Sequence, residues 1–73
     1  MNPAFGEKTM VEIFDIAIER EREAQELYRH AAEMAGPGTD LEKMFRSLEH
    51  EEREHEERLI EDYTQFKAKL GKP

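Results

Sequence analysis

The stretch Ala35-Gly36-Pro37-Gly38-Thr39-Asp40-Leu41-Glu42 decides the fold, because it ends one helix and begins another within eight residues. Glycine and proline side by side break a helix. Thr39 followed three residues later by Glu42 is a capping box, in which each side chain reaches the backbone N–H of the other residue. The segment therefore predicts a short turn between two helices, and helices joined by a short turn pack antiparallel.

The sequence on either side of this turn contains no helix breaker over a long distance. Toward the N-terminus, Thr9 and Glu12 form a second capping box, which predicts a helix over about residues 10–35. Toward the C-terminus, Gly71 is the next stop signal, which predicts a helix over about residues 40–70. The predicted organisation is a loose N-terminal arm at 1–8, a helical hairpin at 9–71 and a tail at 72–73.

Composition narrows the class of protein. The chain has 73 residues, so it forms one domain at most, and so short a chain rarely buries enough apolar surface to be stable alone. It contains no cysteine, which excludes disulfides, zinc knuckles, iron–sulfur clusters and rubredoxin-type iron. The net charge of −7 argues against nucleic-acid binding, and no apolar run is long enough to cross a membrane. We therefore expect a cytoplasmic, all-α protein stabilised by a metal, by oligomerisation or by both.

Each predicted helix carries an apolar stripe at spacings of three and four residues, which keep side chains on one face. Three polar residues interrupt these stripes, namely Glu21 in the first helix and Glu52 and His55 in the second. No lysine or arginine lies on either stripe, and a buried carboxylate without a counter-charge is costly. The stripe positions are Met10, Phe14, Ala17, Glu21, Ala24, Tyr28, Ala31 and Ala35, then Leu41, Phe45, Leu48, Glu52, His55, Leu59, Tyr63, Phe66 and Leu70.

The three polar residues are expected to lie at one level of the hairpin. Glu21 precedes Ala35 by 14 residues, and Glu52 and His55 follow Asp40 by 12 and 15 residues. Because both helices rise equally per residue, the three side chains meet, and the Glu-x-x-His spacing keeps the last two on one face. A divalent cation would satisfy all three groups. Glu21, Glu52 and His55 are therefore the predicted metal ligands and catalytic residues.

Three ligand residues leave a cation under-coordinated, and two helices cannot enclose a core. A two-fold dimer answers both needs, because it makes a four-helix bundle with four glutamates and two histidines facing inward. Four carboxylates balance the charge of two divalent cations, and a carboxylate-rich ligand set favours iron or manganese over zinc. We therefore predict an antiparallel hairpin that dimerises into a four-helix bundle, with a di-iron site shared between two chains and manganese as the alternative metal.

These residues resemble the motifs of a known family. Glu21-x-x-Ala24-x-x-x-Tyr28, followed by Glu52-x-x-His55, is similar to the ligand motifs of the rubrerythrin-like branch of the ferritin-like superfamily. Full-length members carry the motif twice. A single copy resembles the encapsulated ferritins, which are two-helix proteins that build a ferroxidase site between subunits. The resemblance implies that Glu21 and Glu52 bind metal with one carboxylate bridging, that His55 is a terminal ligand, and that Tyr28 donates a hydrogen bond to a ligand. For Tyr28 plain packing stays open as the alternative, since aromatic residues on an apolar stripe normally belong to the core.

The function expected from this resemblance is oxidation of Fe(II) by oxygen or peroxide, for iron storage or detoxification. The resemblance also implies an encapsulin-like shell protein as partner and a protein nanocompartment as location. Two alternatives stay open. One is a rubrerythrin-like peroxide reductase that takes electrons from a separate protein. The other is a metal-free helical dimerisation module, since buried polar residues in a helical seam also fix register.

The remaining charged residues of interest are interpreted as surface. Glu49 and Glu56 flank the stripe of the second helix, and a solvated helix face is preferred there over an entrance route for iron. His30 and His50 fall on the face opposite the stripe and are not expected to bind metal.

A second apolar ridge runs along the first helix. It consists of Ile16, Leu27 and Met34, with Ile13 between ridge and stripe. Exposed apolar patches usually mark an interface. We therefore predict that dimers associate further through the first helix, into an even-numbered homo-oligomer larger than two. The alternative is that the ridge packs inside the hairpin or beneath the N-terminal arm, where Phe5 would cover it.

Overall fold

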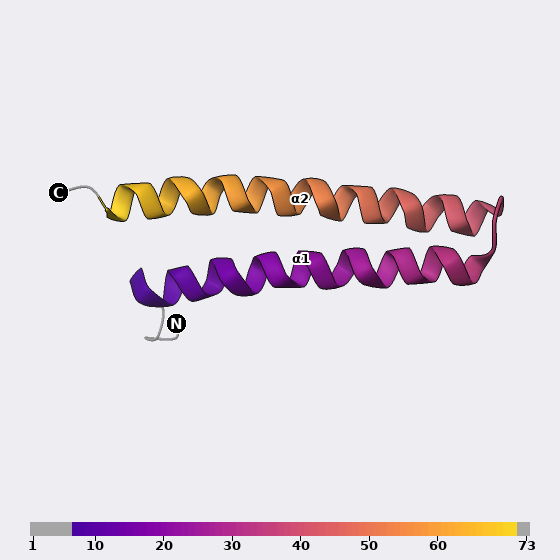
Figure 1. The fold of residues 1–73 in the computed structure, drawn as a ribbon, viewed down its shortest axis with the longest axis horizontal. Helices are drawn as coiled ribbons and strands as arrows, with labels where there is room; N and C mark the ends of the chain where they lie inside the picture. Colours follow the sequence, from indigo (N-terminus) through magenta and orange to yellow (C-terminus); the bar gives the residue numbers. More distant parts are fainter. Residues whose placement is uncertain (1–6, 72–73) are drawn as a thin grey trace.

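The computed structural model describes residues 7–71, and within this range it holds two long helices and no strand. Helix α1 spans Glu7–Ala35 and helix α2 spans Asp40–Leu70. The helices lie side by side, run in opposite directions and are joined by a short turn (Figure 1). The predicted all-α antiparallel hairpin is therefore confirmed. Neither helix has an apolar stretch that could cross a bilayer.

The turn depends on two glycines with positive φ. Gly36 has a φ of 90° and Gly38 a φ of 80°, a region that residues with a side chain rarely adopt. Thr39 then caps α2, because its hydroxyl accepts a hydrogen bond from the backbone N–H of Glu42 at 3.0 Å. The Glu42 carboxylate accepts from the N–H of Gly38 instead of that of Thr39, so the return bond of the predicted capping box is displaced by one residue. These bonds fix where α2 starts, and thereby the level of its side chains.

The start of α1 differs from the prediction. The helix begins at Glu7, not near residue 10, and it runs through Thr9, which is therefore a helical residue and not a cap. No glycine or proline lies between Glu7 and Thr9, so nothing in the sequence keeps these residues out of the helix. The predicted loose arm thus overlaps the helix at its last two residues. The rest of that arm and the tail at 72–73 lie outside the described residues.

The end of α2 falls where the sequence predicts it. Gly71 follows the helix and its backbone N–H bonds to the carbonyl of Lys67 at 3.1 Å. Its φ is −78°, so this glycine ends the helix without the left-handed conformation that glycine often adopts at such positions.

Aromatic side chains join the two helices at two places. Phe14 of α1 stacks on Tyr63 of α2 with ring centroids 5.0 Å apart. Near the turn, Tyr28 stacks on Phe45 with centroids 6.3 Å apart. Phe14 and Tyr28 each lie seven residues, about two turns, from Glu21. The aromatic contacts therefore bracket the level of the predicted ligands and fix the spacing of the helices there.

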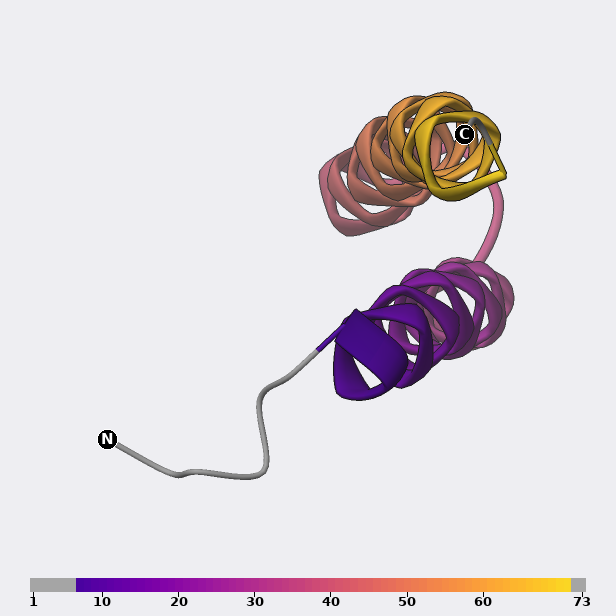
Figure 2. The ribbon, with the colours of Figure 1, turned by 90° about the vertical axis from the view of Figure 1, so that its left-hand side faces the viewer.

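The hairpin buries very little. Among the described residues only Ile18 and Ala32 are buried, at 7% and 1% exposure, and both belong to α1. The end-on view in Figure 2 shows the two helices forming a single layer. The two buried residues lie beside the predicted stripe, so α1 turns the edge of its stripe toward α2 and leaves the centre half-exposed. In the same part of the chain eight large apolar side chains are exposed: Met10, Ile16, Leu27, Met34, Leu41, Met44, Ile60 and Leu70.

Candidate metal centre

Three side chains from the two helices meet near the middle of the hairpin. Glu21 comes from α1, and Glu52 and His55 come from α2. One ligand atom of each lies within 4.8 Å of the others. His55 Nδ1 lies 3.6 Å from Glu21 Oε2 and 3.5 Å from Glu52 Oε1. The fold thus brings together the three residues that the sequence places at one level.

The electrostatics of this cluster are unfavourable without a cation. Glu21 Oε2 is buried and has no hydrogen-bond partner among the described residues. The pKa of Glu21 is raised, first because the Glu52 carboxyl is placed to share a proton with it, and then because of burial and charge repulsion. The imidazole of His55 opposes this shift of the pKa. Within residues 7–71 no lysine or arginine pairs with Glu21 or Glu52, so nothing but His55 offsets their charge.

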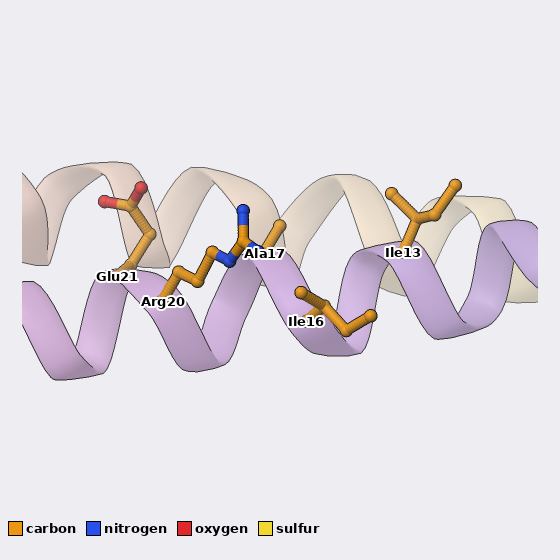
Figure 3. Close-up of a pocket in the computed structure, with 5 residues that line it drawn as sticks. All are labelled: Ile13, Ile16, Ala17, Arg20 and Glu21. Atoms are coloured by element: carbon orange, nitrogen blue, oxygen red, sulfur yellow. The ribbon is translucent and has the colours of Figure 1, made fainter.

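The cluster is open on one side. The His55 side chain is 60% exposed, whereas those of Glu21 and Glu52 are 22% and 21% exposed. A groove of about 480 Å³ runs along α1 beside the cluster (Figure 3), and it is lined by Ile13, Ile16, Ala17, Arg20 and Glu21. Glu21 lines this groove, so the cluster borders partly apolar surface as well as solvent.

Comparison with known proteins assigns this chain to a family. The sequence matches the rubrerythrin family over residues 12–72, a range that includes Glu21, Glu52 and His55. The chain belongs to the rubrerythrin family. No curated protein and no solved structure matches it. Rubrerythrin-family proteins generally bind iron, which agrees with the resemblance seen in the Glu21 and Glu52-x-x-His55 motifs.

The donor set of this rubrerythrin-family chain fits iron. Two carboxylates and one imidazole suit iron and manganese, whereas soft thiolate ligands are absent because the chain has no cysteine. The buried, unpartnered Oε2 of Glu21 is an atom that a cation would satisfy. A cation would also remove the repulsion between the two carboxylates. That one of the two carboxylates would bridge two metal ions stays a prediction.

A second polar contact joins the helices next to His55. Glu56 accepts hydrogen bonds from Arg22 Nε and from Gln25 Nε2, both at 2.7 Å. These bonds hold the pKa of Glu56 below its ordinary value, and the bond from Gln25 has the larger effect. The Glu56 side chain is only 17% exposed, so the interpretation of this residue as part of a solvated face is wrong. Through these two bonds Glu56, the residue next to His55, is tied directly to α1.

The same correction applies to Glu49. Its side chain is 12% exposed and lies between two arginines of its own helix, Arg46 at 3.7 Å and Arg53 at 3.1 Å. Glu49 and Glu56 are seven residues apart, so they share the side of α2 that faces α1. The signal that would have found this side is the row of residues beside the α1 stripe: Ile18, Arg22, Gln25, Arg29 and Ala32.

The other residues singled out from the sequence lie away from the cluster. His30 and His50 are 72% and 66% exposed, as predicted for the solvated face. Tyr28 packs on Phe45 and forms no side-chain hydrogen bond among the described residues. Its role as a donor to a metal ligand stays a prediction.

Proposed function

We propose that this protein oxidises Fe(II) at a di-iron centre whose ligands come from two copies of the chain. The observation that carries the proposal is the cluster of Glu21, Glu52 and His55, in which a buried carboxylate oxygen lacks a partner. Membership of the rubrerythrin family supports iron as the metal, with manganese as the alternative. Iron storage or detoxification would be the physiological outcome.

A second copy of the chain would complete the site. Three donor residues leave coordination positions open, and the exposed side of His55 is where further ligands would approach. Only two apolar residues are buried in the part of the hairpin that the structure describes, so the hairpin also needs another surface to pack against. A two-fold dimer supplies four glutamates and two histidines to two cations and covers the half-exposed stripes.

Bound iron would supply the redox chemistry: two Fe(II) ions lose two electrons, which with two protons reduce oxygen to hydrogen peroxide, or hydrogen peroxide to two water molecules. The residues of the chain would set the driving force. The negative charge of Glu21 and Glu52 stabilises the more highly charged Fe(III) relative to Fe(II). His55 would bind through a neutral nitrogen, so it would add no charge to the four carboxylates that balance two divalent cations. The net charge of −7 attracts cations to the protein surface.

Iron binding and Fe(II) oxidation test the proposal with a matched pair of variants. Glu52→Ala/His55→Ala removes two proposed ligands and should abolish both stoichiometric iron binding and Fe(II) oxidation. Glu54→Ala/His50→Ala removes an exposed pair of the same helix, whose atoms lie 3.8 Å apart, and should leave both properties unchanged. If the first variant oxidises Fe(II) at the rate of the parent, the reaction does not occur at this cluster.

The oxidant consumed distinguishes two reactions of the proposed site. Oxygen uptake on addition of Fe(II) supports a ferroxidase. Sustained peroxide consumption that requires an added electron donor supports the rubrerythrin-like reductase instead, and since the chain has no cysteine that donor would be a separate protein. Purified protein that dimerises but binds no iron would support the metal-free module.

A further inference from the structure

The outer face of α1 carries an apolar ridge that the hairpin does not use. Ile16, Leu27 and Met34 are 52%, 63% and 76% exposed. At about 100° per residue, they lie on the side of α1 opposite the buried Ile18 and Ala32, and about 100° from the centre of the stripe that holds Glu21. In Figure 3, Ile16 lies on the part of α1 turned away from α2, whereas Glu21 points toward α2.

Two charged residues stand between Ile16 and Leu27 on this face. Arg20 and Glu23 are exposed, and neither forms an ion pair among the described residues, although four other arginines do. The order along the face is apolar, positive, negative, apolar, with steps of four, three and four residues. This spacing is the same in both directions, so the face is complementary to a copy of itself turned end for end.

We infer that this face of α1 binds the same face of α1 in a second copy of the chain, antiparallel, about a two-fold axis between Arg20 and Glu23. In this pairing Ile16 meets Leu27 of the second copy, and Arg20 meets Glu23 of the second copy. Two apolar contacts then enclose two ion pairs. A parallel pairing would instead set each charge against its own kind, so the charges select the antiparallel arrangement.

The residues of this contact lie about 100° around α1 from the centre of the stripe that holds Glu21. Ile16 and Arg20 also line the groove beside Glu21, so the two surfaces adjoin, and one chain takes part in both this contact and the proposed metal-site dimer. Each contact is isologous, because the same surface is used on both partners. Two different two-fold contacts per chain generate assemblies with an even number of chains greater than two. An assembly larger than two chains therefore depends on the proposed metal-site dimer. The α1 contact itself forms without the metal.

Exchange of charges tests the pairing directly. Arg20→Glu sets only glutamates against one another across the axis, and Glu23→Arg sets only arginines. Each single variant should therefore associate about tenfold more weakly, or worse, through this contact. The double variant Arg20→Glu/Glu23→Arg restores opposite charges and should associate like the parent. An equimolar mixture of the two single variants should also associate, because each Glu then faces an Arg.

Sedimentation velocity over a range of concentrations, with and without iron, measures these outcomes. Arg58→Glu, on an exposed position of α2, is the charge-matched control and should leave assembly unchanged. Leu27→Glu should break the contact as well. Single variants that associate like the parent, or a mixture that fails to associate, would overturn the inference. Iron content of the parent is measured in parallel. A parent that assembles through this contact but binds no iron counts against the proposed function and not against the contact.

Discussion

Replacing Glu21 by glutamine should stabilise the metal-free protein while it removes a ligand. The ligand atoms of Glu21 and Glu52 lie within 4.8 Å of each other. Two unit charges at that separation repel by about 1 kcal/mol in water and by about 3.5 kcal/mol at an effective dielectric constant of about 20. The lower value applies for two reasons. Solvent still reaches both side chains, which are about one-fifth exposed, and His55 offsets part of their charge. We expect Glu21→Gln to raise the free energy of unfolding by about 1 kcal/mol at pH 8.

The dependence of this gain on pH follows from the raised pKa of Glu21. A carboxyl whose pKa is higher in the folded chain than in the unfolded chain contributes its full stability below the ordinary pKa, here 4.5. That contribution is lost as the pH rises through the folded pKa. The metal-free parent should therefore lose stability between acid and neutral pH. Glutamine at position 21 does not titrate. The difference in unfolding free energy between the two proteins should therefore be small near pH 4 and reach its full value at pH 8.

Urea unfolding with a metal chelator, at one fixed protein concentration, measures this difference. Glu57→Gln is the control, because this residue is exposed and has no ion pair among the described residues. The control removes the same charge from a protein of net charge −7 and should gain less than Glu21→Gln. Equal gains from both substitutions would refute a local repulsion. With added iron the parent should become more stable than Glu21→Gln, because iron stabilises the parent and not this variant.

Three further predictions concern metal, the turn and the contact between the helices. Iron or manganese at about 100 times its dissociation constant should stabilise the parent by about 2.7 kcal/mol in thermal unfolding, and equal melting temperatures with and without metal would contradict the site. Thr39→Ala removes the cap of α2 and should cost about 1 kcal/mol, whereas Thr64→Ala, whose hydroxyl bonds only to its own helix backbone, should cost less in the same urea titration. Glu56→Ala removes the hydrogen bonds that Arg22 and Gln25 of α1 donate to α2 and should weaken Co(II) binding and alter its visible spectrum; an unchanged spectrum would show that Glu56 does not position the ligands.

The turn and the level of the cluster were predictable because both depend on local chemistry. Gly36 and Gly38 adopt backbone angles that other residues avoid, and Thr39 bonds to a residue three positions away. Once the turn is fixed, the equal rise of two helices places Glu21 opposite the Glu52-x-x-His55 turn without further information.

The rotation of α1 was not predictable from the sequence. The apolar residues of α1 cover an arc wider than one stripe, because the ridge of Ile16, Leu27 and Met34 lies beside the stripe. The pattern therefore does not show which edge of the arc faces α2. Ile18 and Ala32 mark that edge in the structure. Glu56 and Arg22 are 34 residues apart in the sequence, so their contact becomes visible only when the rotation is known.

The hairpin places the outer ends of both helices, Glu7 and Leu70, on the same side of the molecule (Figure 1). If two hairpins are joined about an axis perpendicular to the helices, the end of α2 in one copy and the start of α1 in the other lie a helix length apart. For the 31 residues of α2 that distance is about 46 Å, which an extended chain spans with about 14 residues. An axis parallel to the helices would bring the two ends together and need only a few residues. Ferritin-like chains with four helices contain one long crossover connection, which is what a covalent fusion of two antiparallel hairpins of this kind requires.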